Sequence, residues 1–269
     1  MPRIISASRR TDLPAFHGDW FMEQVREEEV TYQHPFNGKP VTVSLKPEDV
    51  TAVVFWSKNF SPFLPHLEEL DRQGFSLLFH FTITGLPSYL EERVPPPQET
   101  VETFRYLAHR YSPRQVLWRY DPIFLGEGLD FNYHRKVFSR LCRALEGYTK
   151  RCYISFVQSY RKVDARLAAR GITLTKTTSE EQLRLAEELS DLAAGSGIKM
   201  YACCSDQLVG EKVEKARCID ADLLHFLFGN DATRYRRRPS RSSCGCSEST
   251  DIGRYNTCLH RCVYCYANR

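Results

Sequence analysis

The sequence predicts an α/β protein built as a complete or partial (β/α) barrel of the TIM type, with a cysteine-rich C-terminal tail. Short apolar runs alternate with helical segments of ten or more residues, which is the pattern of parallel βαβ units. No glycine-rich phosphate turn follows the first apolar run, and this favours a barrel over an open dinucleotide-binding sheet. Eight of the ten cysteines lie between residues 203 and 269, so the end of the chain differs from the rest.

The expected elements follow one another along residues 1–230. Apolar runs rich in β-branched and aromatic residues predict six strands, at 2–8, 51–59, 75–85, 115–124, 151–160 and 199–206, and VTVSL at 41–45 is a further candidate. Helical spacing predicts helices at 14–29, 61–74, 98–111, 131–147, 178–195 and 221–229. Ser61 and Pro62 are expected to begin the second of these helices, and Gly74 to end it. Residues 1–230 are therefore predicted to form the barrel-like domain.

Residues 231–269 are expected to form a tail that packs on the barrel mouth. Residues 234–249 are basic, serine-rich and without periodicity, as in a linker or surface loop. The 20 residues after them are too few and too polar to fold alone. The segment from Asp231 to Cys246 has enough reach to cross the strand ends, since an extended chain covers about 3.3 Å per residue.

Composition and charge narrow the class of protein. An apolar fraction of 42% suffices for a sizeable core, and a net charge of +4 does not by itself indicate nucleic acid. No apolar run is long enough to span a bilayer, so no membrane partner is expected. The first residues carry charge where a signal peptide has its apolar region. We therefore expect a cytoplasmic protein, in which cysteines more often bind metals or act in catalysis than form disulfides.

Three cysteines near the end of the chain have the spacing of a metal-binding loop. Three residues separate Cys258 from Cys262, and two separate Cys262 from Cys265. Three thiolates on one loop can hold three irons of a 4Fe-4S cluster and leave the fourth iron open. Tyr264 is expected to shield such a cluster from water. The alternative is a zinc site with His260 as its fourth ligand.

The motif CLHRCVYC resembles the signature of the radical S-adenosylmethionine (SAM) superfamily, and CVYCYAN resembles its form in the spore photoproduct lyase group. The segments IISASRRTDLPAF, WRYDPI and DIGRYNTCLHRCVYCYAN resemble the uncharacterised family DUF1848. The resemblance implies an enzyme in which an open iron chelates SAM and reductive cleavage yields a 5′-deoxyadenosyl radical. It also implies a small-molecule substrate and an electron donor of the flavodoxin or ferredoxin type. In the superfamily at large the motif follows the first strand, where this chain has SRRTD instead.

Two alternative functions stay open. One is a different cleavage of SAM, which transfers its 3-amino-3-carboxypropyl group to an acceptor. The other is a zinc-stabilised protein that binds nucleic acid through the basic segment 234–241. The low net charge and the scarcity of aromatic residues in that segment count against the second alternative.

The other late cysteines suggest a second metal site. One of Cys203 and Cys204, together with Cys218, Cys244 and Cys246, makes four thiols, enough for a second iron–sulfur cluster or a structural zinc ion. The alternative is that they are buried, inert side chains. Cys142 and Cys152 are expected to be core residues.

Polar residues follow several expected strands, and barrel enzymes carry their chemistry at the C-terminal ends of the strands. We expect catalytic roles for Arg9, Arg119 and Asp121, where the two arginines are placed to bind a carboxylate. We expect cofactor contacts from Thr82, Ser155 and Tyr264. Structural ion pairs, Arg10 with Asp12 and Arg119 with Asp121, are the simpler alternative. The tail cysteines are expected to face the mouth lined by these residues.

Overall fold

Eight parallel strands form one sheet in the order β10-β1-β4-β5-β6-β7-β8-β9. The computed structural model describes residues 2–35, 37–231, 234–238, 241 and 243–269. The strands are β1 (Arg3–Ala7), β4 (Val50–Ser57), β5 (Leu77–Thr82), β6 (Val116–Ile123), β7 (Arg151–Phe156), β8 (Lys199–Ala202), β9 (Val213–Lys215) and β10 (Thr250–Asp251). Because neighbouring strands are parallel, their carboxyl ends all meet at one edge of the sheet.

The sheet is open, so the prediction of a complete barrel is wrong. In the described ranges, β10 pairs only with β1 and β9 pairs only with β8. A barrel closes when its first and last strands share hydrogen bonds, and here these edge strands have two and three residues. The gap between them is filled by side chains: Cys218, Ile219, Leu223 and Cys246 pack against Ile4, Val54 and Leu117 on the inner face of the sheet. This packing closes the core without a closed ladder of hydrogen bonds.

The helices largely follow the sequence pattern. They are α1 (Leu13–Phe16), α2 (Gly18–Arg26), α3 (Leu67–Arg72), α4 (Pro97–Arg110), α5 (Phe131–Leu145), α6 (Arg161–Ala168), α7 (Ser179–Ala194) and α8 (Ala221–Phe228). The helix expected at 14–29 is divided at His17, whose backbone is not helical. The helix expected at 61–74 begins as a 3₁₀ segment, Ser61–His66, in which Pro65 lies inside the segment and lacks the N–H group that an α-helix would use there. Ser61 makes no capping hydrogen bond there.

The strand candidate at 41–45 is present as β3 (Pro40–Ser44), which pairs antiparallel with β2 (Glu29–Gln33) in a hairpin separate from the large sheet. Strand β2 and helix α6 were not predicted. The short strands β9 and β10 were not predicted either, since segments of two or three residues carry no readable periodicity.

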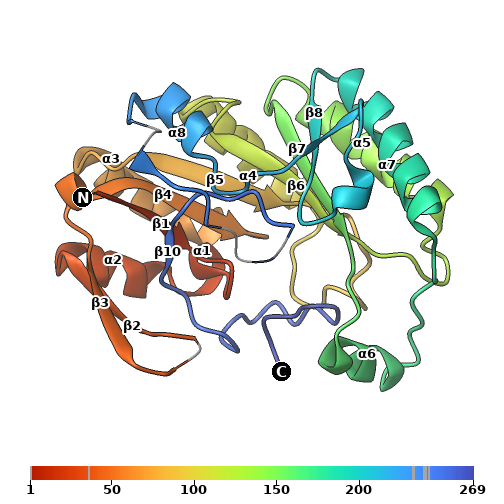
Figure 1. Ribbon diagram of the computed structural model, residues 1–269, viewed down its shortest axis with the longest axis horizontal. Coiled ribbons are helices and arrows are strands. Elements are labelled where there is room, and N and C mark those ends of the chain that lie inside the picture. The colour runs from red at the N-terminus through yellow and green to blue at the C-terminus, as the bar shows by residue number, and fades with distance from the viewer. Residues whose placement is uncertain (1, 36, 232–233, 239–240, 242) are drawn as a thin grey trace.

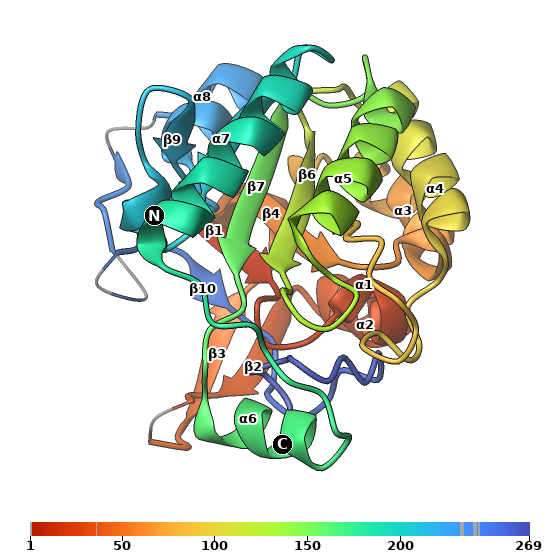
Figure 2. The same ribbon diagram turned by 90° about the vertical axis from the view of Figure 1, so that its right-hand side faces the viewer.

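Side chains of successive residues point to opposite faces of the sheet. Phe79, Phe81 and Trp118 belong to the larger core, which also contains buried residues of α4, α5 and α7, and Figure 2 shows these helices together on one face of the sheet. Leu78 and Leu117 belong to the smaller core on the other face. Cys142 and Cys152 lie in the larger core, which confirms their expected role in packing.

The last part of the chain runs past the carboxyl ends of the strands. Strand β10 lies beside β1, with Ser6 opposite Asp251, and the segment after it continues below the sheet in Figure 1. Figure 2 shows this segment and α6 beyond the arrowheads of β6 and β7. There Cys262, Val263 and Tyr264 join a third apolar cluster with Leu90, Phe124 and residues of α6.

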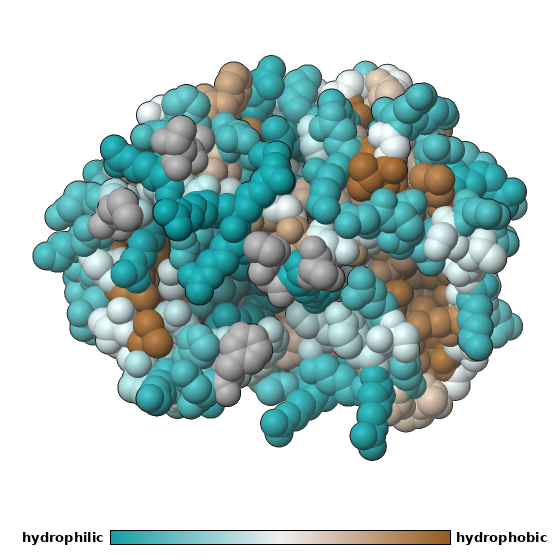
Figure 3. Space-filling model, viewed as in Figure 1, coloured by the Kyte–Doolittle hydropathy of each residue, from teal (hydrophilic) through white to brown (hydrophobic). Residues whose placement is uncertain are grey.

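The surface of the face drawn in Figure 3 is mostly hydrophilic. Among the described residues, no helix combines the length and the apolar character needed to cross a membrane.

Candidate functional site

A cavity of about 300 Å³ lies where the strands end and the tail crosses them. It is lined by all the residues expected to be catalytic or to contact a cofactor: Arg9, Thr82, Arg119, Asp121, Ser155 and Tyr264. The eight late cysteines line it too: Cys203, Cys204, Cys218, Cys244, Cys246, Cys258, Cys262 and Cys265. The fold thus brings together residues that are spread over the whole chain.

Strand periodicity explains why the polar side chains share this cavity. Trp56, Thr82, Arg119 and Ser155 occupy neighbouring strands, β4 to β7, and point to the same inner face of the sheet. Asp121 lies two residues after Arg119 and therefore points the same way. Each lies near the carboxyl end of its strand, so together they form the floor of the cavity.

Arg119 and Asp121 form an ion pair within β6. Ser155 donates a hydrogen bond to the other carboxylate oxygen of Asp121. Although burial alone lowers the pKa of Arg119, the carboxylate of Asp121 holds it well above its ordinary value. The guanidinium also lies over the rings of Trp56 and Tyr153, with centroid distances of 5.2 and 5.6 Å. Arg119 is thus a fixed cation in the cavity floor.

The three-cysteine loop is held in place by a buried histidine. His260 Nε2 lies 2.7 Å from Asp12 Oδ2, and His260 Nδ1 lies 3.1 Å from the backbone oxygen of Arg93. Asp12 also accepts hydrogen bonds from the backbone N–H groups of Lys58 and Ala15. The pair expected between Arg10 and Asp12 is therefore not formed, because Asp12 binds the loop and Arg10 lies near Asp251.

A second buried contact holds the other end of the loop. Tyr264 donates its hydroxyl hydrogen to Glu91, which also accepts from Lys58 Nζ and Thr84 Oγ1, each at 2.8 Å. Glu91 and Cys262 further form an isolated antiparallel bridge between their backbones. The carboxylate of Glu91 thereby fixes the loop on the strand ends.

The thiols of this loop lie among hydrogen-bond donors and a cation. Burial raises the pKa of Cys258 to about 12, and a backbone N–H group from His260 opposes that shift. Burial likewise raises the pKa of Cys262, which the Lys58 ammonium opposes. The N–H group of Ala267 donates to Cys265 Sγ at 3.3 Å. In the part of the chain that is described, no three His, Cys, Asp or Glu side chains are arranged around a single metal ion.

The other five late cysteines form a ring of thiols on the same cavity wall. Cys203 Sγ lies 3.2 Å from Cys218 Sγ. Cys218 also contacts Cys246, and Cys246 contacts Cys244. Cys204 contacts both Cys203 and Cys244, so the contacts among the five thiols form a closed ring. We call these five side chains the thiol ring.

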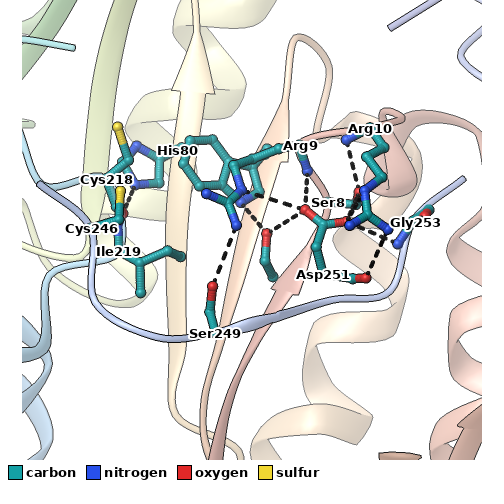
Figure 4. A network of polar contacts seen from close by, with 12 residues as sticks. Ser8, Arg9, Arg10, His80, Cys218, Ile219, Cys246, Ser249, Asp251 and Gly253 are labelled. Carbon is teal, nitrogen blue, oxygen red and sulfur yellow. Dashed lines mark hydrogen bonds and ion pairs between the residues drawn. The ribbon is translucent and has the colours of Figure 1, made fainter. Parts of the chain in front are cut away.

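Asp251 is the hub of a buried network that attaches the tail to β1 (Figure 4). Its carboxylate accepts hydrogen bonds from Ser6 Oγ at 2.9 Å, Ser8 Oγ at 2.6 Å, the Arg9 N–H at 2.9 Å and the Gly253 N–H at 3.1 Å. The guanidinium groups of Arg9 and Arg10 lie 3.5 and 3.8 Å from it. The approach is close, since a Cβ on Gly253 would lie 1.9 Å from Ser8 Oγ. Arg9 is therefore a partner of the tail as well as a cavity residue.

Sequence reasoning missed Asp251, Glu91 and the pairing of Asp12 with His260. The bonds of Ser8 with Asp251, Asp12 with His260 and Glu91 with Tyr264 each join residues more than 150 positions apart. The signal in the sequence that could have indicated Asp251 was an acidic residue in a segment rich in cysteine and serine. Contact of the basic segment 234–241 with nucleic acid was one of the alternatives left open; its residues 239–240 lie outside the described residues. Within it, Arg238 pairs with Glu248, and Arg241 lies over the ring of Tyr266 at the cavity.

A comparison with the models of protein families gives a match over most of the chain. The model of a family described as "Domain of unknown function (DUF1848)" matches residues 4–267. No curated protein matches the chain.

Proposed function

This chain belongs to the DUF1848 family, and from that premise we propose that it is a radical SAM enzyme. Its 4Fe-4S cluster would be held by Cys258, Cys262 and Cys265. The observation that carries the proposal is that these three thiols face a cavity floored by strand-end polar residues, while His260 is engaged elsewhere. Structural zinc sites usually have four protein ligands. With both ring nitrogens of His260 held by Asp12 and Arg93, the loop offers three ligands, as a cluster with an open iron requires.

The residues present fit such a cluster. The N–H donor to Cys265 and the Lys58 ammonium near Cys262 favour thiolate sulfur over neutral thiol. Tyr264 lines the cavity beside the loop and is buried, in keeping with the shielding role expected for it. The ten cysteines are thiols and not disulfides, in keeping with the reducing cytoplasm where we place the protein. When bound and reduced, the cluster supplies the electron that cleaves a carbon–sulfur bond of SAM and so starts radical chemistry on a substrate.

The cavity residues define what this chain contributes. The volume of about 300 Å³ suits a small molecule, and we propose a small-molecule substrate. Arg119 presents a fixed positive charge, and Asp121 orients it; Thr82 and Ser155 offer hydroxyl groups for the cofactor from the neighbouring strands. Trp56 and Tyr264 give the walls apolar surface that limits the access of water. In this proposal the open sheet and its helices form a partial (β/α) barrel. Arg9 lies where the tail joins β1.

Anaerobic incubation of the protein with SAM and dithionite, followed by nucleoside analysis, tests the proposal. We expect 5′-deoxyadenosine; 5′-methylthioadenosine instead would indicate transfer of the 3-amino-3-carboxypropyl group. A flavodoxin or ferredoxin should replace dithionite as electron donor. The variant Cys258→Ala/Cys262→Ala/Cys265→Ala should be inactive, whereas the matched variant Cys142→Ala/Cys152→Ala should retain activity. A colourless wild-type protein with one zinc ion per loop and no SAM cleavage would refute the proposal and favour the zinc-stabilised alternative.

A further inference from the structure

We propose that the thiol ring binds a second iron–sulfur cluster, held by four of its five cysteines, on the wall of the same cavity. This inference goes beyond the proposed function, because it concerns Cys203, Cys204, Cys218, Cys244 and Cys246 and not what the tail loop binds.

The ring gathers thiols from three separate parts of the chain. Cys203 and Cys204 follow β8, Cys218 follows β9, and Cys244 and Cys246 precede β10. The Sγ atoms of Cys203 and Cys218 are 3.2 Å apart, and all five side chains line the cavity. Core packing does not explain this arrangement, because Cys203, Cys204 and Cys244 are only partly buried. Thiolates are the usual ligands of iron–sulfur clusters, and a fully ligated cluster takes four.

The backbone is shaped to bring these thiols together. Consecutive side chains of an extended chain point in opposite directions, yet Cys203 and Cys204 both line the cavity. The turn is made by Cys204, whose φ of 50° lies in the left-handed region, which is strained for a residue other than glycine. Structures keep such strain mainly at functional sites.

A close backbone approach places the other two thiols. A Cβ on Gly245 would lie 2.9 Å from the backbone oxygen of Ala216, so only glycine fits between Cys244 and Cys246 without a shift of the chain. This approach sets Cys246 beside Cys218. The sequence Cys-Gly-Cys is therefore required by the geometry of the ring.

The surroundings suit sulfur that carries negative charge. Arg119 Nη1 lies 3.3 Å from Cys218 Sγ. The N–H group of Ile219 donates to Cys246 Sγ at 3.4 Å, and the N–H group of Cys246 donates to Cys244 Sγ at 3.5 Å. Such donors are placed for thiolate, which accepts hydrogen bonds more strongly than a thiol does.

The number of thiols and their exposure favour a cluster over one zinc ion. Five thiols line the cavity, one more than a tetrahedral zinc site uses. The ring also opens on the cavity, whereas structural zinc sites are closed.

The test uses two complementary variants after anaerobic reconstitution with iron and sulfide. In Cys258→Ala/Cys262→Ala/Cys265→Ala, the ring is intact, and we expect iron and acid-labile sulfide at about half of the wild-type level, as for one of two four-iron clusters. In Cys218→Ala/Cys246→Ala, the same measurement should report loss of the other half. Cys142→Ala/Cys152→Ala, which removes two core cysteines, should keep the wild-type amount.

Loss of all iron from the first variant would overturn the inference, and so would zinc in place of iron. If the ring variant fails to fold, the tail variant alone decides, with the electron paramagnetic resonance signal of its reduced cluster as the second measurement. If the tail variant retains iron and the wild-type protein does not cleave SAM, these two results together would refute the proposed function and support the second cluster.

Discussion

Replacing Asp251 by alanine should detach the tail from β1 and destabilise the whole protein. The carboxylate is 6% exposed and is surrounded by donors only. Two hydroxyl groups, two backbone N–H groups and the guanidinium groups of Arg9 and Arg10 point at it. Alanine leaves all of these donors facing a void, with two positive charges uncompensated.

The size of the effect follows from the burial of the partners. Removing one member of a fully buried ion pair costs about 3–5 kcal/mol. The side chains of Arg9 and Arg10 are 25% and 17% exposed, so water compensates part of the loss and the lower end applies. We expect the free energy of unfolding to fall by about 3 kcal/mol, which raises the unfolded fraction roughly a hundredfold.

Urea unfolding of the metal-free, reduced protein measures this change, with the slope m checked for constancy. The matched control is Asp191→Ala, which removes an acid from an exposed pair with Lys212 and should cost less than about 1 kcal/mol. Trypsin should cleave the Asp251 variant after Arg254 faster than it cleaves the wild type or the control. If Asp251→Ala unfolds within 1 kcal/mol of the wild type and its tail stays protected, the network does not seat the tail.

Three further predictions concern the thiol ring, the three-cysteine loop and His134. Gly245→Ala should lower the iron content of the tail triple-alanine variant to near zero, because the added Cβ forces Cys244 and Cys246 away from Cys218; unchanged iron would contradict the close approach to Ala216. Glu91→Ala leaves the Lys58 ammonium buried without its carboxylate, so the free energy of unfolding should fall by about 3 kcal/mol and trypsin should reach Arg261; Glu188→Ala, from a more exposed pair, is the control. Burial lowers the pKa of His134 below 6.5. Between that lowered pKa and 6.5, the unfolded chain binds a proton that the folded chain does not. The free energy of unfolding should therefore fall as the pH drops from 7 to 5. The variant His134→Gln should show a shallower fall in the same urea titration, and an equally steep one would assign the effect to other groups.

Much of the sheet could be predicted because its central strands are long apolar runs. The run at 75–85 contains β5, and the run at 115–124 contains β6. The closure of the sheet could not be predicted in this way, since it depends on β9 and β10 and on the side chains that fill the gap between them. Sequence periodicity reports which face of an element is apolar, but not whether two edge strands are close enough to pair.

The same distinction explains which residues of the site could be predicted from the sequence. Thr82, Arg119, Asp121 and Ser155 were predictable because each stands at the end of a readable strand, with a fixed direction set by the pleat. Asp251 and Glu91 were not, because their roles arise from contacts with segments far away in the sequence. The pairing of Asp12 with His260 also needed the path of the tail, which no local pattern contains.

Strand β10 explains how a three-cysteine motif late in the sequence lies at the carboxyl ends of the strands. This strand lies beside β1 and runs parallel to it, with Ser6 opposite Asp251. A parallel strand ends at the same edge of the sheet as its neighbours, so the chain leaves β10 next to the loop that leaves β1. A loop that follows β10 can therefore occupy the region that a loop after the first strand would reach, whatever its number in the sequence. The contacts of Asp251 with Ser6, Ser8 and Arg9 fix where the tail leaves β1, and the contacts of Asp12 with His260 and of Glu91 with Tyr264 then hold the three-cysteine loop on the strand ends.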